Sequence, residues 1–484
     1  MQVRQKMMPA AIAGWFVLIA TSFSMVPLST ARAATLEVNN SIPCSNTTGA
    51  PYCTIGAAVG QAVAGDIISV ATGTYTEQVT ITRSGTAEAP IAIAANLGAI
   101  VKSGTYGFDL SGVSWITIDG FTVSNTTSHA FRCVLCSNVS LINNATKFPG
   151  GNGISISNSS DLTLNGNVVE DSKSHGIEVT ASTRLNINGG SVTRSGFQIS
   201  GKVKNGIKFR GTTVSNIERT LVHYNSDMGI YLIEGTTGVR VKGVTAHHNA
   251  RGYERIAAGI ESRSDGNIVE SCIAYANEDS GINMRWGGSN GFMVNNITYR
   301  NGDHGIDVLE SPNPRIINNT VYKNVTAGIN VEGNSPNGYI LNNISVDNGI
   351  KSPRTEGNIR ATSTSIPLAL NYNIVYSSGG EKLYLYWRTY FYTLAKLRAA
   401  YPSVEVNGIQ ADPRWVDRVL DDYRLAAGSP AIDSGKSDAV PTSEGNQDAA
   451  GNSRCDDPFT ANTGIGPRTY DDRGAYEHVV NCPG

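Results

Sequence analysis

The sequence predicts an all-β protein wound as a right-handed parallel β-helix. A Gly-Ile phrase recurs eight times between Gly153 and Val331, at intervals of 22 to 30 residues. Each phrase is followed by a second apolar, asparagine-rich segment, such as LTLNGN from Leu162. A repeat of this length indicates a solenoid whose units bury their apolar faces only by stacking. Paired strands so close together leave no room for the helices of a leucine-rich repeat.

Residues 1–33 are typical of a secretory signal peptide. They hold Arg4 and Lys6, an apolar run from Ala10 to Leu28, and a small-residue exit ending at Ala33. No later apolar stretch approaches the roughly 20 residues that a membrane span requires. We therefore expect a protein without a membrane span that is secreted, or that lies in the periplasm or on the cell surface.

Residues 34–375 are expected to form the β-helix and its N-terminal cap. Thr54 can N-cap a short amphipathic helix that covers the open end of the first coil. Strand-like segments then continue from Gly73 to Asn371, enough for roughly twelve coils at the observed repeat length. Asparagines recur at one phase of the turns and suggest an asparagine ladder.

Residues 376–484 depart from the repeat. An aromatic segment, KLYLYWRTYFYTLAKLRAAYP, ends in a helical pattern at Pro402 and reads as a C-terminal lid. The tail that follows contains SPAID and DDRGAYE phrases. These resemble the closing module of secreted bacterial β-helix proteins, and the resemblance implies an architectural role for the tail.

The cysteine spacing fits an exported protein. The sequence suggests three disulfides, Cys44–Cys53, Cys133–Cys136 and Cys455–Cys482, because export permits them. Cys272 falls at an inward strand position, so we expect a buried thiol.

The charge balance excludes some partners. The net charge is −2 at neutral pH, so nothing global points to nucleic acid or to an anionic membrane. We expect a monomer.

Outward side chains should form columns along the solenoid. In each Gly-Ile phrase the isoleucine and the residue two beyond it should point inward, so the alternate residues point outward and stack coil on coil. The first column reads Ser155, Glu178, Lys208, Tyr231, Glu261, Asn283, Asp307, Asn330. The second reads Ser157, Thr180, Arg210, Ile233, Arg263, Arg285, Leu309, Glu332. Charge concentrates in the middle coils, and the inserted loops near Phe197 and Ala250 could wall a groove beside it.

A groove with several arginines, a lysine and an aromatic ring suits an anionic linear polymer, in particular a polyuronate. Arginine offers a planar fork that matches a carboxylate. β-Elimination needs neutralisation of that carboxylate, a base for the C5 proton and a donor for the leaving oxygen. Lysine is the easier base, because arginine is rarely deprotonated.

Two segments resemble known polysaccharide lyases. The stretch from Ala50 to Ile91, APYCTIGAAVGQAVAGDIISVATGTYTEQVTITRSGTAEAPI, is similar to the start of the pectate lyases of polysaccharide lyase family 9. The phrases ESRSDGN and NMRWG are similar to a motif pair of the chondroitinase B and alginate lyase family. That resemblance puts Arg263 in the place of the lysine base and Arg285 in the place of the arginine acid. Trp286 stands where that family has histidine.

The sequence therefore predicts a secreted polysaccharide lyase acting on an acidic glycan such as pectate or alginate. The predicted catalytic residues are Arg263, Arg285 and Lys208. The predicted substrate-binding residues are Arg210, Tyr231, Glu261, Asn283, Trp286, His304 and Asp307.

Calcium is the cofactor that both resemblances raise. The carboxylates that bind calcium in the chondroitinase B and alginate lyase family fall here on Ile256 and Ala258, and the calcium aspartates of the family 9 pectate lyases are also missing. A different calcium site could be assembled from oxygen ligands. Its candidate ligands are Glu261, Asp279, Asp303 and Asp307.

Three other functions remain open on the same scaffold. A glycoside hydrolase would need two carboxylates, and Glu261 and Asp307 stand two coils apart, about 9.6 Å from the strand spacing. A C5 epimerase would share the first step of the lyase and differ in reprotonation. A cell-surface solenoid that binds polysaccharide without turnover would present aromatic platforms for sugar rings.

Overall fold

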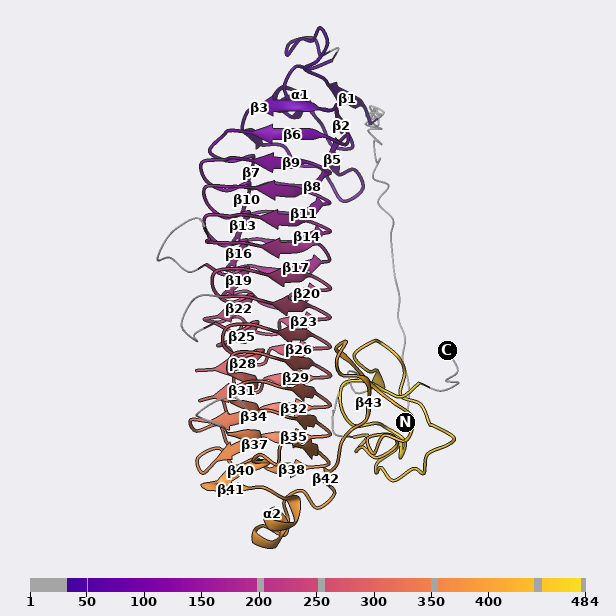
Figure 1. Cartoon of the computed structure of the whole chain (residues 1–484). Coiled ribbons are helices and arrows are strands. Elements are labelled where there is room, and N and C mark those ends of the chain that lie inside the picture. The colour runs from indigo at the N-terminus through magenta and orange to yellow at the C-terminus, as the bar shows by residue number, and fades with distance from the viewer. Residues whose placement is uncertain are drawn as a thin grey trace, which may run out of the picture.

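The predicted parallel β-helix is confirmed by the computed structural model, which describes residues 33–49, 51–197, 204–250, 257–349, 356–438 and 446–479. Within these residues the coils build three 14-stranded sheets along one axis, here named A, B and C (Figure 1). Successive coils pair in parallel, and the chain passes through one strand of each sheet before it returns to the first. The predicted signal peptide precedes the described residues.

Sheet A consists of β1 (Thr35–Val38), β2 (Ile67–Val70), β5 (Ile91–Ala95), β8 (Ser114–Asp119), β11 (Ser137–Ile142), β14 (Ser160–Asn165), β17 (Thr183–Asn188), β20 (Asn216–Glu218), β23 (Arg240–Lys242), β26 (Ile268–Glu270), β29 (Phe292–Val294), β32 (Arg315–Ile317), β35 (Tyr339–Leu341) and β38 (Ala369–Asn371).

Sheet B consists of β3 (Gly73–Thr76), β6 (Ala99–Lys102), β9 (Thr122–Ser124), β12 (Ala145–Lys147), β15 (Val168–Glu170), β18 (Ser191–Thr193), β21 (Leu221–His223), β24 (Thr245–His247), β27 (Ile273–Tyr275), β30 (Ile297–Tyr299), β33 (Thr320–Tyr322), β36 (Ile344–Val346), β39 (Ile374–Tyr376) and β42 (Ile409–Gln410).

Sheet C consists of β4 (Val79–Ile81), β7 (Phe108–Ser111), β10 (Phe131–Val134), β13 (Ile154–Ser157), β16 (Ile177–Thr180), β19 (Ile207–Arg210), β22 (Ile230–Ile233), β25 (Ile260–Ser262), β28 (Ile282–Arg285), β31 (His304–Leu309), β34 (Ala327–Glu332), β37 (Gly357–Thr362), β40 (Tyr384–Trp387) and β41 (Thr389–Phe391). The ladder thus continues past Tyr376, because β40 pairs in parallel with β37.

Short helices cover the two ends of the solenoid (Figure 1). At the N-terminal end lies α1 (Ile55–Gln61), and its predicted N-cap is confirmed, because the Thr54 side chain accepts a hydrogen bond from Ala57 N at 3.3 Å. The Glu77 carboxylate accepts from Ile55 N and Gly56 N, both at 2.9 Å, so further amides of the first turn are satisfied. At the other end, α2 (Leu394–Ala400) begins after the N-cap Thr393.

The core is a set of apolar side chains stacked in register. The isoleucines of the Gly-Ile phrases pair from β25 to β37 and are fully buried. They are Ile260, Ile282, Ile306 and Ile329, and Ile359 of a Gly-Asn-Ile phrase continues the stack. Each such side chain contributes roughly 1.5–3 kcal/mol through the apolar surface it removes from water. The predicted inward phase of the phrase is therefore confirmed.

Buried asparagines form ladders at the turns. Asn301 illustrates the pattern: its Nδ2 donates to Ala274 O in the preceding coil at 3.0 Å and to Asn324 Oδ1 in the next at 2.9 Å. Its Oδ1 accepts from Asn277 N and Nδ2 at 3.1 and 3.0 Å. A second ladder, through Asn296, Asn319, Asn343 and Asn373, runs at the other turn of sheet B. The turns thus satisfy their buried polar groups through one repeated residue type.

The tail docks against sheet B. The strands β43 (Trp415–Asp417) and β44 (Asp422–Leu425) carry Trp415 and Tyr423, whose rings meet Tyr322 and Tyr299 with centroids 5.2 Å apart in each pair. The GAYE phrase adds a backbone contact, from Gly474 N to Asn342 O at 2.7 Å. These contacts agree with the architectural role expected for the tail, whose strand β43 lies beside the later coils in Figure 1.

The cysteines behave largely as predicted. Disulfides join Cys44 to Cys53 and Cys133 to Cys136. Cys272 is a buried thiol, and burial raises its pKa to about 12. Of the third predicted pair, Cys455–Cys482, Cys482 lies outside the described residues. Among the helices of the described segments, none combines the length and the apolar character needed to cross a membrane.

Replacement of Asn301 by alanine should destabilise the fold markedly. The change leaves the Asn277 amide groups and Ala274 O without partners, and each orphaned buried group costs about 1–3 kcal/mol. Asn188→Ala is the matched control, because Asn188 lies on the exposed face and hydrogen-bonds Asn165 at 3.4 Å. Equilibrium denaturation of both variants measures the difference. Equal losses of stability would contradict the role assigned to the ladder.

The C-terminal end of a ladder predicts a pH dependence of stability. Glu405 is fully buried and accepts hydrogen bonds from Asn373 and Tyr384; burial raises its pKa to about 7, although these hydrogen bonds lower it. The folded protein therefore holds a proton that the unfolded chain releases at lower pH. Relative to Glu405→Gln, the free energy of unfolding should fall as the pH rises from about 4.5 to about 7, by at most roughly 1.4 kcal/mol per pKa unit. The measurement is a series of denaturant titrations of the wild type and of Glu405→Gln across this pH range. A difference in unfolding free energy that stays constant with pH would contradict the prediction.

Candidate functional site

The outward columns predicted from the sequence are present on sheet C. Glu178 pairs in register with Lys208, Lys208 with Tyr231, and Tyr231 with Glu261. The column continues through Asn283, Asp307 and Asn330. Arg263 lies directly after β25 rather than inside it, and its N donates to Leu232 O at 2.8 Å. Sheet C therefore places the predicted side chains on consecutive coils.

Arg263 lies between two aromatic rings. Its guanidinium carbon is 5.1 Å from the centre of the Tyr231 ring and 4.3 Å from that of Trp286. The Nε atom donates to Glu261 Oε1 at 2.5 Å, and Glu261 is completely buried. Among the described residues, the two terminal nitrogens of Arg263 have no hydrogen-bond partner. Since the Trp286 ring is 49% exposed, the pair faces solvent.

Arg285 joins two aspartates. Its Nη2 donates to Asp279 Oδ2 at 3.0 Å and to Asp307 Oδ2 at 2.9 Å, and its Nε also donates to Asp307 Oδ2, at 3.1 Å. All three side chains are largely buried. Asp307 comes from the next coil and Asp279 from the turn before β28, so the arginine ties the strand face to the turn.

The pKa values in this group move in opposite senses. Burial raises the pKa of Asp279 to about 7; the Arg285 charge lowers it, whereas Asp307 and other neighbouring carboxylates raise it further. Burial alone would lower the pKa of Arg285, but Asp307 and Asp279 raise it above its usual value. An arginine whose pKa is raised gives up its proton even less readily. The pairing therefore opposes the acid role that the resemblance implies for Arg285.

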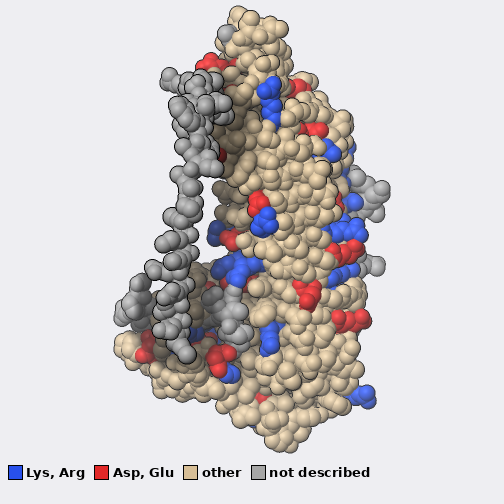
Figure 2. All heavy atoms as spheres, turned by 180° about the vertical axis from the view of Figure 1, so that it is seen from behind, with Lys and Arg blue, Asp and Glu red and all other residues tan. Residues whose placement is uncertain are grey.

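Lys208 and Arg210 lie on an earlier coil and have carboxylate partners of their own. Lys208 Nζ donates to Glu178 Oε1 at 3.2 Å, and Arg210 Nε donates to Glu234 Oε2 at 2.7 Å. The predicted basic groove is therefore balanced by carboxylates. Figure 2 agrees with this for the face it shows, where blue and red side chains lie next to one another and no continuous basic strip is seen.

A second set of polar side chains follows on the next coils. Asn330 Nδ2 donates to Asp307 Oδ1 at 2.7 Å and to Glu332 Oε1 at 3.1 Å, and lies 3.3 Å from His304 Nε2. Arg360 Nη1 donates to Asn330 Oδ1 at 2.6 Å and also to the Glu332 carboxylate. Arg360 was not predicted, because its phrase reads Gly-Asn-Ile-Arg instead of Gly-Ile. Arg360 could have been identified by extending the first outward column by one coil, because Arg360 lies in register with Asn330.

The calcium site considered from the sequence is not assembled as expected. In the described part of the chain, the group whose ligand atoms lie within 4.8 Å of one another is His304, Asp307 and Glu332. Of the four candidate ligands only Asp307 belongs to it; Glu261 is bonded by Arg263, and Arg285 bonds both Asp279 and Asp307. Calcium prefers oxygen ligands throughout. A set that includes an imidazole nitrogen fits a transition metal better.

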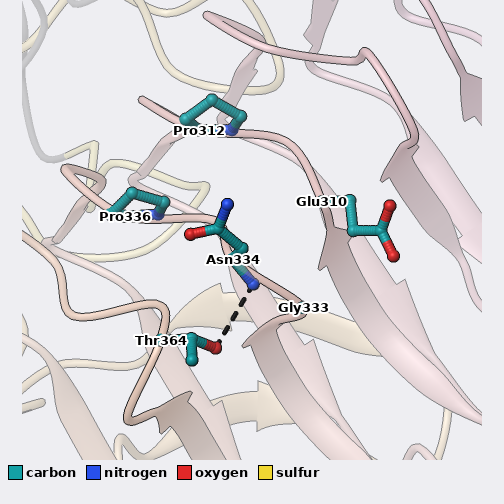
Figure 3. A pocket seen from close by; sticks show the side chains of 6 residues that line it. All are labelled: Glu310, Pro312, Gly333, Asn334, Pro336 and Thr364. Atoms are coloured by element: carbon teal, nitrogen blue, oxygen red, sulfur yellow. Dashed lines mark hydrogen bonds between the residues drawn. The ribbon is translucent and has the colours of Figure 1, made fainter.

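A hollow lies at the C-terminal ends of β31, β34 and β37, directly beyond this second set. Its volume is about 650 Å³. Figure 3 shows its lining, which consists of Glu310, Pro312, Gly333, Asn334, Pro336 and Thr364. Asn334 N donates to Thr364 Oγ1 at 3.3 Å across one side. The lining has one charged residue, Glu310, so the hollow offers shape and few polar contacts.

Comparison with known proteins supports the fold. A family model described as a right handed beta helix region matches residues 185–387, and one described as periplasmic copper-binding protein (NosD) matches residues 63–243. Among curated proteins, no sequence matches. The disulfides agree with an extracytoplasmic location.

Several solved structures are distantly similar to this chain. Pectate lyase Pel9A is 16% identical, with 92% of this chain and 96% of that chain covered and a TM-score of 0.47. An alginate lyase from Paenibacillus sp. str. FPU-7 is 15% identical, with 58% and 93% covered and a TM-score of 0.40. A family 6 polysaccharide lyase from Pseudopedobacter saltans is 14% identical, with 73% and 89% covered and a TM-score of 0.43. These likenesses concern the fold alone, and the same fold hosts different chemistries.

Arg285→Leu should destabilise the protein by about 3–5 kcal/mol, because it leaves two buried carboxylates without their cation. Thermal and denaturant unfolding measure the loss. Arg184→Leu is the matched control: Arg184 is exposed and pairs with Asp161 of the preceding coil, so its loss should matter far less. Equal stability of the two variants would contradict this prediction, because the buried pairs of Arg285 would then stabilise the fold no more than the exposed pair of Arg184.

Proposed function

We propose that the outer face of sheet C binds an extended acidic glycan and cleaves it by β-elimination. The observation that carries this proposal is the state of Arg263. Glu261 fixes its Nε, two aromatic rings flank it, and its terminal nitrogens have no partner among the described residues. A guanidinium held in this way presents a planar fork to a ligand carboxylate. The aromatic rings add apolar surface for a sugar ring.

The direction of the glycan follows from three neighbouring side chains. Lys208 pairs in register with Tyr231, and Arg263 lies over the Tyr231 ring. The three therefore follow one another along the solenoid axis. A chain laid over them would place one uronate carboxylate at Arg263 and the adjacent glycosidic bond near Tyr231 and Lys208.

The proposed chemistry assigns one task to each group. Arg263 neutralises the uronate carboxylate, which acidifies the C5 proton. Lys208, in its neutral form, takes that proton, the C4–O bond breaks, and a C4=C5 double bond forms. Tyr231 gives its proton to the leaving oxygen. Burial raises the pKa of Tyr231 to about 12, so its phenol keeps a proton to donate. Arg285 positions Asp307 and Asp279 and leaves proton transfer to others.

Hydrolysis is the second candidate, and one observation favours it. Asp279 has a pKa raised to about 7 and lies on the same Arg285 nitrogen as Asp307. One protonated and one ionised carboxyl group form the acid and base pair of a glycoside hydrolase. In this pair Asp279 takes the place that Glu261 has in the sequence-based alternative; all three carboxylates are buried.

The proposal includes the setting of the protein. We place it outside the cytoplasm as a monomer whose partner is an anionic polysaccharide. The disulfides support this setting, as does the match to a family model whose description names a periplasmic protein. Nucleic acid is no part of it, since the net charge of −2 gives the chain no overall basic character.

Arg263→Ala should lower kcat/KM for elimination by on the order of 100-fold or more, because the uronate carboxylate loses its neutralising partner. The assay is the ultraviolet absorbance of the unsaturated uronate, measured with pectate, alginate and chondroitin. Tyr231→Phe should lower kcat while substrate binding is kept.

Arg184→Ala serves as the control, since this arginine pairs with a carboxylate on sheet A, away from the site. It should retain full activity. Full activity in Arg263→Ala would contradict the proposed site. New reducing ends without ultraviolet absorbance would replace elimination by hydrolysis, and binding without either product would indicate a glycan-binding solenoid.

A further inference from the structure

We propose that His304, Asp307 and Glu332 bind a first-row transition-metal dication at the position of the Asn330 amide nitrogen. The three ligand atoms lie within 4.8 Å of one another. All three surround one point, because Asn330 Nδ2 is 2.7 Å from Asp307 Oδ1, 3.1 Å from Glu332 Oε1 and 3.3 Å from His304 Nε2.

The amide nitrogen cannot satisfy all three neighbours. An asparagine NH₂ group has two hydrogens, whereas three acceptors converge on it. The three atoms belong to strands β31 and β34, so the fold itself brings them together. Buried acceptors that outnumber the available donors favour the entry of a cation.

Two further buried atoms near this point lack a hydrogen-bond partner within the described segments. His304 Nδ1 is one, and Asn283 Oδ1, one coil earlier in the same column, is the other. His304 is 6% exposed and Asn283 is fully buried. Asn283 Nδ2 donates to Glu261 in the preceding coil. The Asn283 amide oxygen is therefore the atom that can face Asp307 in the next coil. With His304 Nε2 as the acceptor its Nδ1 carries the proton, so Asn283 Oδ1 is the acceptor near the cluster that the described part of the chain does not pair.

An earlier coil shows how the same arrangement is balanced. His175 and Glu178 occupy the positions that His304 and Asp307 occupy in their own Gly-Ile phrase. There, the residue in register on the next coil is Lys208, whose ammonium group bonds Glu178 at 3.2 Å. At the later coil the residue in register is the neutral Asn330. The in-register cation of the first position is therefore replaced by a neutral amide at the second, where the cation that bonds Asp307 is Arg285 of the preceding coil.

The donor set indicates the class of ion. One imidazole nitrogen and two carboxylates suit Zn²⁺ and its neighbours among the divalent metals, whose bonds to nitrogen and oxygen are about 2.0–2.2 Å. Rotation of the Asn330 amide, together with withdrawal of the side chain by about one metal–oxygen bond length, would free this point for the ion and leave the amide oxygen as a fourth ligand. Arg360 faces that oxygen now and also bonds Glu332, so it would keep a carboxylate partner after the rotation.

The charges packed around the cluster allow one dication. Asp307 is also bonded by Arg285, and Glu332 by Arg360, while Asp303 lies 3.7 Å from His304 Nε2. Glu356 pairs with Arg360 at 3.2 Å. Each guanidinium group is thus shared by two carboxylates, Arg285 by Asp279 and Asp307 and Arg360 by Glu332 and Glu356, which leaves negative charge for an ion to neutralise.

The experiment is a calorimetric titration of the full chain, first treated with a chelator, with Zn²⁺ alone. We expect one high-affinity site per chain and a rise in Tm on binding. His304→Ala and Asp307→Asn should each weaken binding by at least about tenfold. Asn330→Asp should tighten it, because a carboxylate replaces the amide. Circular dichroism confirms that each variant is folded.

Two histidine variants are matched controls. His175→Ala removes the equivalent residue of the earlier coil, and His247→Ala removes one of the histidines stacked on sheet B, where His247 Nδ1 lies 2.8 Å from His248 Nδ1. Both should bind Zn²⁺ as the wild type does. The proposal is overturned if the folded wild type binds no Zn²⁺, if His304→Ala binds it unchanged, or if His247→Ala abolishes binding. Weaker binding by Asn330→Asp would also count against the position assigned to the ion.

Discussion

Each buried asparagine of the turns links three successive coils through one amide group, and the rest of the structure depends on this link. Asn301 bonds the coil before it through Asn277 and Ala274 and the coil after it through Asn324. A coil alone could satisfy neither the amide nor the turn carbonyl. Because the link has one geometry, it holds every strand in the same register, and side chains of equal phase stack along the axis.

This register also builds the candidate site. It brings charged residues of neighbouring coils to one strand spacing from each other, about 4.8 Å. At that distance opposite charges pair, and the arginines of sheet C bond carboxylates from the same strand, a neighbouring strand or the adjacent turn. Recognition of an anionic ligand then rests on the few donors that remain, above all the terminal nitrogens of Arg263. Most of the other charged groups on this face are already paired with each other.

The sequence could predict whatever repeats. The inward isoleucines, the outward columns, the N-cap at Thr54 and the core position of Cys272 all follow from phase and spacing, and the structure confirms them. Ion pairing could not be predicted, because it depends on which rotamer reaches which neighbour. Arg285 selects Asp279 from a turn as well as Asp307 from a strand. The contact of Trp415 with Tyr322 joins residues far apart in the chain and carries no periodic signal.

The most direct test of the account is a crystal structure of the protein bound to an oligouronate. The oligouronate is either an unsaturated product or a substrate analogue that the protein cannot cleave. The account predicts that the oligosaccharide lies along the axis on sheet C, with one carboxylate on the terminal nitrogens of Arg263, its sugar ring against Trp286 and the next glycosidic bond near Tyr231. An oligosaccharide bound on sheet A or sheet B, or in the hollow beside Pro312 with Arg263 untouched, would contradict it.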